Sequence, residues 1–165
     1  MAVQHLIDRG YTRIAYIGGQ ETSPSNQIRL LAYQQTLQEN GMTTDPHLIS
    51  FGSFNIDGGY QRMQAMVSLS QPPDAVFCGN DIIAMGVLQY AREHKIRIPE
   101  DFGIIGFDDI SYASLPLISL STVSQPRNKL GEQALQALLR EIDQFPARTR
   151  QRILVEPELK IRSTT

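Results

Sequence analysis

The fold is decided by the stretch Asp74-Ala-Val-Phe-Cys-Gly-Asn-Asp81-Ile-Ile-Ala-Met-Gly86, which joins two kinds of hydrophobic pattern. Residues 74–78 form a short apolar run, which is typical of a strand buried on both faces of a parallel sheet. Asn80 or Asp81 can cap the helix that follows, and the apolar stripe of that helix is Ile82, Met85, Leu88 and Ala91. The stretch therefore predicts a strand, a short turn and a helix, the repeating unit of an α/β protein.

The same unit recurs on both sides of this stretch. We expect strands at residues 13–17, 47–51 and 102–107, and helices from about 30 to 37 and from Asp57 to Val67. A helix that starts near Val3 and ends at Gly10 precedes the first strand. Because the connections are short, these elements predict an α/β fold with a doubly wound parallel sheet and flanking helices.

The last third of the chain is less regular. Residues 118–123 are expected to be extended, and Gln125-Pro126 opens a helix with an apolar stripe that runs to Ile142. Residues 153–161 resemble a closing strand that Pro157 interrupts. A proline cannot donate to a sheet ladder, so this strand is predicted to be at an edge or in a crossing segment.

The composition is that of an ordinary soluble globular domain, with 41% hydrophobic and 19% charged residues in a chain of 165. A chain of this size buries about 70% of its unfolded surface, so it needs neither a metal nor a disulfide to be stable. The lone Cys78 ends an apolar run and is expected to be buried and reduced, which favours the cytoplasm. We find neither the roughly 20 apolar residues of a membrane span nor a signal-peptide pattern.

Two classes of function lack their sequence signatures. The formal net charge of −2 is spread without a basic run, so these residues are not expected to bind DNA. Gly18-Gly19 opens neither a dinucleotide-binding nor a phosphate-binding loop, and no serine lies in a G-x-S-x-G sequence. Metal-ligand spacing is absent around the histidines, which are His5, His47 and His94. We therefore expect a binding protein rather than an enzyme, with no metal and no cofactor.

Polar residues follow the predicted strands at four places: 20–25 with Arg29 one turn into the next helix, 53–55, 79–81 and 108–109. In doubly wound sheets ligands bind outside the carboxyl ends of the strands. These segments hold an arginine, a carboxylate, an amide, hydroxyls and an aromatic ring, which suit a ligand rich in hydroxyl groups.

Each of these residues also has a structural interpretation. Helix capping explains the polar residues that precede helices: Asn80, Asp81, Ser23 and Ser25. Arg29 can be a solvated helix residue, and Phe54 can belong to the core. Asp108 is harder to explain structurally, because a carboxylate directly after a buried strand needs partners that offset its desolvation. A paired structural role is the alternative for it.

Four stretches, taken in order, resemble the LacI/GalR family of bacterial transcriptional repressors: Val76–Gly86, Arg97–Asp101, Gly103–Asp109 and Leu120–Pro126. The likeness extends to essentially the whole chain through Arg13–Gly19 and through Arg29–Tyr33, which is similar to the family's R-x-x-G-[FY] helix. Ala32 departs from that motif, since it stands where glycine is common.

The resemblance implies a domain organisation. Family members have a helix-turn-helix headpiece, a hinge helix and a core of two subdomains that are similar to type I periplasmic sugar-binding proteins. It places residues 1–124 in the C-terminal subdomain, 125–150 in a crossover helix of the N-terminal subdomain, and 151–165 in a returning strand and tail. We therefore expect a chain that begins inside an element and that reaches operator DNA only through a headpiece it lacks.

The resemblance also implies roles for the strand-end residues. Asp108 and Asn80 would bind hydroxyls of the effector, and Arg29 would bind a ring oxygen, a hydroxyl or an acidic group. Weaker matches lie in the contacting loops: Ser23, Ser25 and Phe54. The implied effector is a sugar, a sugar derivative or a nucleoside. Closure of the two subdomains on it would alter a dimer whose headpieces read an operator.

The homodimer contact implied by the family comprises two residues on one helix and an apolar loop: Met85, Gln89, Leu115, Pro116 and Leu117. The alternative is that the three loop residues are core, because an exposed apolar loop needs a partner. Two other classes of function stay open, namely a free-standing or exported sugar-binding protein of the same fold and an enzyme built on the α/β sheet.

Overall fold

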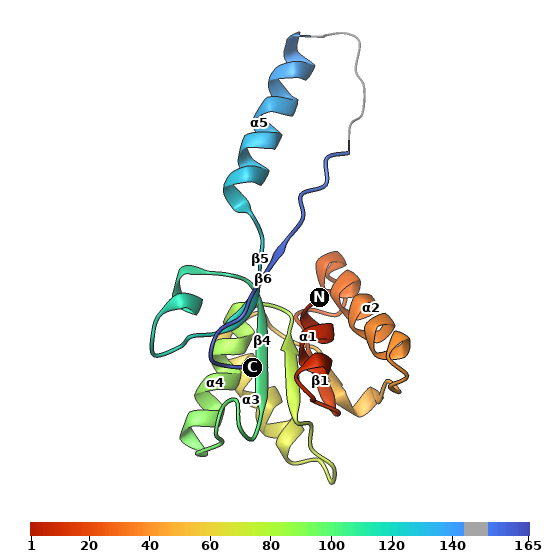
Figure 1. The fold of residues 1–165 in the computed structure, drawn as a ribbon, viewed down its shortest axis with the longest axis vertical. Helices are drawn as coiled ribbons and strands as arrows, with labels where there is room; N and C mark the ends of the chain where they lie inside the picture. Colours follow the sequence, from red (N-terminus) through yellow and green to blue (C-terminus); the bar gives the residue numbers. More distant parts are fainter. Residues whose placement is uncertain (144–151) are drawn as a thin grey trace.

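The computed structural model of the chain describes residues 1–143 and 152–165. Its centre is a six-stranded sheet in the order β2-β1-β3-β4-β5-β6. The first five strands are parallel, and β6 runs antiparallel to β5. Figure 1 shows this sheet in a body from which one helix projects. The predicted α/β architecture is confirmed, with an antiparallel strand added at one edge.

The strands are β1 (Ile14–Ile17), β2 (Ile49–Ser50), β3 (Ala75–Cys78), β4 (Gly103–Asp108), β5 (Ser121–Ser124) and β6 (Glu158–Lys160). The helices are α1 (Ala2–Asp8), α2 (Pro24–Glu39), α3 (Ile56–Val67), α4 (Asp81–Glu93) and α5 (Arg127–Asp143), with short 3-10 turns η1 (Pro46–Leu48) and η2 (Ser111–Ser114).

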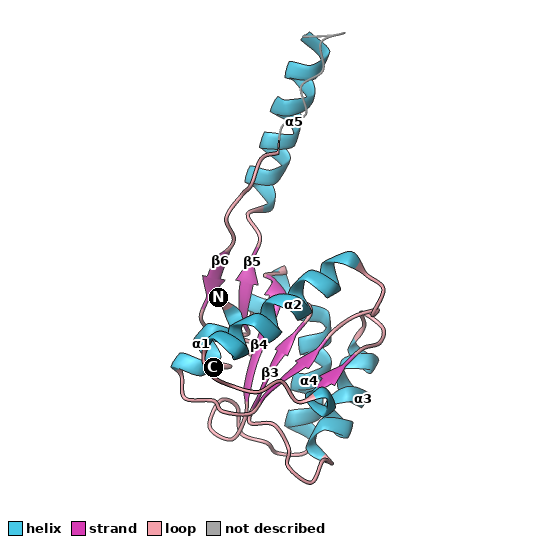
Figure 2. Cartoon of the chain, turned by 90° about the vertical axis from the view of Figure 1, so that its right-hand side faces the viewer, coloured by secondary structure: helices cyan, strands magenta, loops and turns pink. Residues whose placement is uncertain are grey.

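Helices cover both faces of the sheet, as Figure 2 shows. Alternate residues of each strand point to opposite faces, so Ile14 and Tyr16 pack with α1 and α2, whereas Ala15 and Ile17 pack with α3 and α4. The four residues of β3 are all buried, which is the signature of a central parallel strand. Cys78 ends that strand fully buried, as predicted, and burial raises the pKa of its thiol.

Two glycines let α3 and α4 pack with their backbones in contact. A Cβ added at Gly59 would lie 2.2 Å from the carbonyl oxygen of Ile83, and one added at Gly86 would lie 2.0 Å from that of Ile56. A side chain at either position would push the helices apart. This pair therefore fixes α4, and with it the turn that precedes α4, relative to the sheet.

Three local predictions are corrected by the structure. The strand expected at 47–51 is shortened to β2 because Pro46–Leu48 forms a 3-10 turn capped by Asp45. Helix α3 begins one residue before the expected Asp57 because its N-cap is Asn55, the side chain of which accepts a hydrogen bond from the Gly58 amide. The closing strand begins only after Pro157 and lies at the sheet edge, where a missing amide donor is tolerated.

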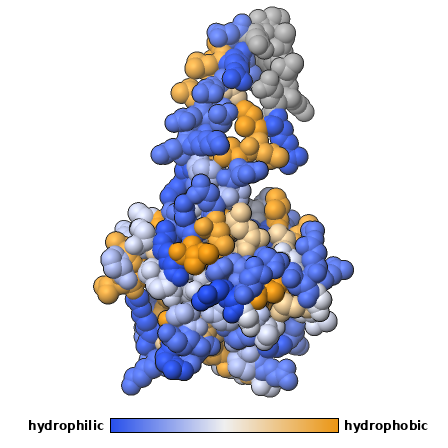
Figure 3. All heavy atoms as spheres, in the orientation of Figure 1, coloured by the Kyte–Doolittle hydropathy of each residue, from blue (hydrophilic) through white to orange (hydrophobic). Residues whose placement is uncertain are grey.

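Helix α5 projects from the body of the domain (Figure 1). It begins at Arg127, just after the predicted start at Gln125-Pro126, and contains no buried residue. Its large apolar side chains are between 40% and 62% exposed: Leu130, Leu135, Leu138, Leu139 and Ile142. Figure 3 shows apolar atoms along this projecting segment. Part of the predicted unit 125–150 and the first residue of 151–165 lie outside the described residues.

Candidate functional site

The carboxyl ends of β1, β3 and β4 meet at one edge of the sheet, as the topology requires. Backbone hydrogen bonds continue past the strand ends, because the Gly79 amide donates to the Ile17 carbonyl at 2.8 Å and the Gly52 amide to the Gly19 carbonyl at 3.1 Å. The loops that carry the predicted site residues therefore lie side by side. Four residue groups from distant parts of the sequence form one edge.

Arg29 connects two of these strand ends. Its Nη1 donates to the carbonyl oxygen of Gly79 at 2.8 Å, and its Nη2 lies 3.8 Å from Asp108 Oδ1. The guanidinium carbon is 3.9 Å from the ring centroid of Phe107, a cation–π contact. The side chain is only 16% exposed. The interpretation of Arg29 as a solvated helix residue is therefore wrong.

Asp108 is the last residue of β4, and its backbone is in an unusual conformation. Its φ is 111° and that of Asp109 is 50°. Residues other than glycine rarely adopt positive φ values. The Asp108 carboxylate accepts a 2.6 Å hydrogen bond from Gln125 Nε2 and faces Arg29. Asp108 therefore has the internal partners that its structural interpretation requires, on a strained backbone of the kind that is common at ligand sites.

Asp109 also anchors this turn. Its carboxylate accepts a 2.7 Å hydrogen bond from Arg162 Nη2, and its carbonyl accepts one of 2.8 Å from Arg127 Nη2. Burial would raise the pKa of Asp109, but the hydrogen bond and charge of Arg162 outweigh it, so that pKa lies below its ordinary value. Asp109 is therefore a structural ion-pair residue.

Asn80 caps α4, as its structural interpretation predicts. Its Oδ1 accepts a 2.9 Å hydrogen bond from the Ile83 amide. Its Nδ2 has no hydrogen-bond partner among residues 1–143 and 152–165, and the residue is half-buried. The cap uses the oxygen alone, so capping and binding through the amide nitrogen are compatible.

The three weaker candidates lie at the β1 and β2 ends of the same edge. Ser23 occupies the N-cap position of α2 without a side-chain cap, and its Oγ lies 3.0 Å from that of Ser25. The predicted capping by these hydroxyls is therefore wrong for Ser23. The Phe54 ring is half-buried against the core and covers Gly19, where an added Cβ would lie 1.8 Å from a ring carbon.

Sequence reasoning missed two residues that shape this edge. Asn26 is buried, and its Oδ1 accepts hydrogen bonds from the Gly19 amide at 2.9 Å and from Tyr16 Oη at 2.7 Å. Gln125 was identified only as the start of a helix, although it binds Asp108. Its place directly after β5, at the carboxyl edge of the sheet, is the signal that would have found it.

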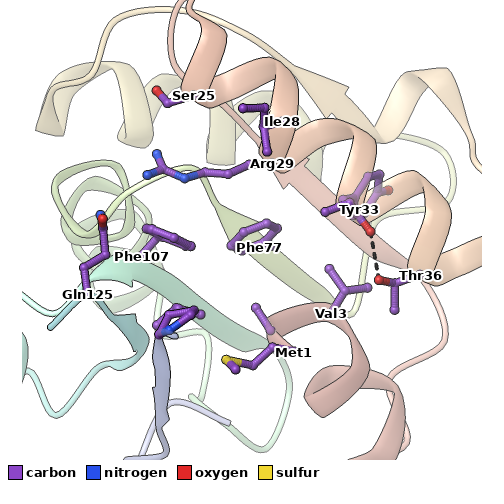
Figure 4. A pocket seen from close by; sticks show the side chains of 14 residues that line it. Met1, Val3, Ser25, Ile28, Arg29, Tyr33, Thr36, Phe77, Phe107 and Gln125 are labelled. Atoms are coloured by element: carbon purple, nitrogen blue, oxygen red, sulfur yellow. Dashed lines mark hydrogen bonds between the residues drawn. The ribbon is translucent and has the colours of Figure 1, made fainter. Parts of the chain in front are cut away.

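A pocket of about 340 Å³ opens beside Arg29, between α1, α2 and the sheet. Figure 4 shows Arg29 and Gln125 at one end of it and Phe77 and Phe107 between them and α1. The wall opposite the sheet includes Ile28 and Tyr33 of α2. Of the predicted site residues, this pocket is lined by Arg29 and Ser25. Its lining does not include the other four, which are Asp108, Asn80, Ser23 and Phe54.

Asp81 is a buried carboxylate behind this edge. It is fully buried at the first turn of α4, and it accepts hydrogen bonds from Thr122 Oγ1 at 2.5 Å and from the Ile110 amide at 2.8 Å. Burial raises its pKa from 3.8 to about 6, although both hydrogen bonds act in the opposite direction. Folding therefore makes Asp81 bind its proton more tightly than in the unfolded chain, although the carboxylate still predominates at neutral pH.

We expect Asp81 to lower the stability of the protein as the pH rises. Because its folded pKa of about 6 lies above the ordinary value of 3.8, its contribution is complete below pH 4 and is lost as the pH rises through about 6. Asp81→Asn is neutral at every pH and removes this dependence. Thermal unfolding from pH 4 to 8 should show the midpoint of wild type falling relative to that of the variant. A difference that is constant with pH would contradict the assignment.

Other chemistries find no support in the described part of the chain. Across residues 1–143 and 152–165 there is no group of three or more potential metal-ligating His, Cys, Asp or Glu side chains. Within the same ranges, no helix has the length and apolar character that crossing a membrane requires.

A doubly wound sheet with an arginine, a carboxylate, amides and aromatic rings at the carboxyl ends of its strands is typical of α/β domains that bind small molecules. The chain matches the periplasmic binding protein-like domain over residues 3–165 and belongs to that family.

Similar proteins are transcriptional regulators. The HTH-type transcriptional repressor CytR of Escherichia coli (strain K12) is 38% identical over 164 residues, which cover 99% of this chain and 48% of CytR. A regulatory protein of the LacI family from Chloroflexus aggregans has 31% identity and a TM-score of 0.92, over 99% of this chain and 58% of that one. The transcriptional regulator CelR in complex with cellobiose has 30% identity and a TM-score of 0.91, over 99% of this chain and 50% of that one.

These comparisons confirm the resemblance to LacI-type regulators. The chain spans about half the length of the curated relatives it matches. The proteins compared are regulators rather than enzymes.

Proposed function

We propose that this chain is the C-terminal part of the effector-binding core of a LacI-type transcriptional regulator and that it binds a sugar or a similar polyhydroxylated molecule. The observation that carries the proposal is the pairing of Arg29 and Asp108 at one sheet edge, beside an open pocket. A planar donor and a carboxylate that approach a ligand from different elements give charge-assisted hydrogen bonds of fixed direction. Such a pair distinguishes one arrangement of hydroxyls from another.

The roles follow from the positions. Asp108 accepts hydrogen bonds from effector hydroxyls, and Arg29 donates to a hydroxyl or ring oxygen. The Nδ2 of Asn80 donates to a third oxygen. Ser23 and Ser25 contact the ligand from the start of α2, and Phe54 offers its ring to an apolar face of the ligand. The solved structure of CelR, a neighbour in structure, is a complex with cellobiose, which supports a carbohydrate as the effector class.

The rest of the regulator would cover the apolar surface that α5 exposes. We propose that α5 reaches into a second subdomain, because its large apolar side chains are at least 40% exposed. An effector held between the two subdomains would favour their closed arrangement and so alter DNA binding by a separate headpiece. A transcriptional regulator must reach the chromosome, so we propose that this protein is located in the cytoplasm.

The proposed homodimer contact lies on the α4 side of the body. Leu117 is 84% exposed and Leu115 is 46% exposed, and Pro116 is exposed between them. Met85 is half-buried on α4 and Gln89 is exposed one turn later. The interpretation of residues 115–117 as core is wrong. An exposed apolar loop of this kind supports a subunit contact.

A panel of small molecules tests the proposed function. Thermal unfolding of the full-length regulator should be measured with D-ribose, D-glucose, cellobiose, glucose 6-phosphate and uridine. A ligand that binds only the native state raises the midpoint by mass action. We expect at least one polyhydroxylated compound to raise it, and Arg29→Ala to remove the increase. An increase that persists in Arg29→Ala would contradict the proposed site.

The chain alone is not expected to bind operator DNA. The sequence has no long basic run, and its formal net charge is −2. It therefore lacks the run of Lys and Arg side chains that would neutralise the phosphates of DNA. Fluorescence anisotropy of labelled operator DNA should stay unchanged at low and at physiological salt. Saturable binding by the 165-residue chain would overturn this expectation.

A further inference from the structure

Asp81 links the two parts of the chain that carry Asn80 and Asp108. Its Oδ2 accepts from the amide of Ile110, two residues after Asp108, and its Oδ1 accepts from Thr122 Oγ1 on β5. Asn80 precedes it directly as the cap of α4. One buried carboxylate therefore joins α4, the turn after β4, and β5.

The turn that Asp81 contacts needs an external support. Two successive non-glycine residues, Asp108 and Asp109, have φ values of 111° and 50°. Such conformations cost energy and persist only where the surroundings determine them. The Ile110 amide is fixed by Asp81, and the Asp109 carboxylate is fixed by Arg162. These two contacts connect the turn to α4 and to the segment after β6.

Burying the Asp81 carboxylate is energetically unfavourable, and a glycine in β4 leaves the space for it. A Cβ at Gly106 would lie 2.2 Å from Asp81 Oδ1, so the glycine in β4 leaves the space that the carboxylate occupies. Burial of a carboxylate is unfavourable even when it is hydrogen-bonded. A group that only filled space at this position would be apolar.

We propose that Asp81 is a positioning residue for effector binding: through the Ile110 amide it sets the direction in which the Asp108 carboxylate faces the ligand. The inference rests on the proposed function, because it concerns the same ligand. The effect of Asp81 on Asp108 can be tested independently of the proposed function, because the orientation of Asp108 can be measured without a ligand. Gln125 Nε2, which donates to Asp108 Oδ1 at 2.6 Å, is the reporter.

The ligand-free experiment follows the side-chain amide resonance of Gln125 by NMR in the full chain. Asp81→Ala removes both acceptors and should shift this resonance, because Asp108 moves away from Gln125. Asp81→Asn keeps an acceptor for the Ile110 amide and should leave the resonance near its wild-type position. Val87→Ala is the matched control. It truncates another fully buried side chain of α4 and lowers stability by creating a cavity, but it should not shift the resonance.

The binding experiment uses the same variants in the full-length regulator, with D-ribose, D-glucose, cellobiose, glucose 6-phosphate and uridine as probes, at temperatures where all variants are folded. Asp81→Ala should weaken binding of the active probe about tenfold or more, as expected when a charge-assisted hydrogen bond is misdirected. Asp81→Asn should stay within about threefold of wild type. Val87→Ala should bind like wild type.

Thr122 supplies a second test in case Asp81→Ala does not fold. Thr122→Val removes the donor that anchors Asp81 Oδ1, whereas Thr122→Ser keeps it. We expect a shifted Gln125 resonance and weaker binding in the valine variant, with both restored in the serine variant.

The proposal is overturned if the Gln125 resonance and the affinity are unchanged in both Asp81→Ala and Thr122→Val, or if Val87→Ala changes them equally. Failure of the proposed function has a different result. In that case no probe binds wild type, while the resonance still reports whether Asp81 positions Asp108.

Discussion

Asp108→Ala is expected to weaken effector binding about 10- to 100-fold while the domain stays folded. The variant loses a charge-assisted hydrogen bond, worth about 1.5 to 3 kcal/mol. The carboxylate is the acceptor that faces both Arg29 and Gln125 at the sheet edge. Its removal leaves Arg29 held by the Gly79 carbonyl and by the Phe107 ring, so the site loses the acceptor without losing the arginine.

Calorimetric titration of the full-length regulator measures this effect. Asp57→Ala is the control, since Asp57 is an exposed acid in the first turn of α3 and should leave the affinity unchanged. Thermal unfolding of both variants shows that the fold is kept. An affinity equal to that of wild type in Asp108→Ala would exclude the carboxylate from the site.

Leu117→Asp is expected to convert a two-fold dimer of the full-length regulator into monomers. Each substituted residue occurs twice in a two-fold interface, so the variant places two unpaired charges in a desolvated surface. The cost is on the order of several kcal/mol. Leu117 is the most exposed of the large apolar residues in the described ranges, at 84%, so the substitution should not disturb the subunit fold.

Analytical ultracentrifugation at micromolar concentration distinguishes the two states. Leu31→Asp is the control, because Leu31 is 64% exposed on α2, which packs on the opposite face of the sheet from α4. That variant should remain dimeric. A monomeric wild type, or a dimer that survives Leu117→Asp, would show that residues 115–117 form no subunit contact.

The elements with strong hydrophobic patterns could be predicted from the sequence. The apolar runs of β1, β3 and β4 locate the sheet, because burial on both faces leaves few alternatives. The stripe predicted for α4 is only half right, since Leu88 and Ala91 are buried whereas Ile82 and Met85 are half-buried. Gly10, predicted to end α1, has a φ of 94°, as a helix C-terminus often requires. The length of β2 could not be predicted, since Pro46 and the Asp45 cap compete locally with the strand.

The sequence predicts where the candidate site residues lie better than it predicts what their side chains contact. Parallel strands bring their carboxyl ends together, so the segments of Arg29, Asn80 and Asp108 could be placed at one edge. Hydrogen bonds between side chains distant in sequence, such as that from Gln125 to Asp108, follow from the arrangement of strands and leave no local pattern. The contacts of Asp81 could not be predicted for the same reason. A residue that caps a helix and a buried residue that contacts a distant turn can have the same local sequence.

A crystal structure of the full-length regulator with the polyhydroxylated compound that most raises its unfolding midpoint tests the central claim most directly. The account predicts the ligand at the carboxyl ends of β1, β3 and β4, with its oxygens within hydrogen-bonding distance of Arg29 and Asp108. A ligand bound elsewhere, such as in the polar pocket around Arg13 and Asp45 at the opposite ends of the strands, with the Arg29–Asp108 edge unoccupied, would contradict it.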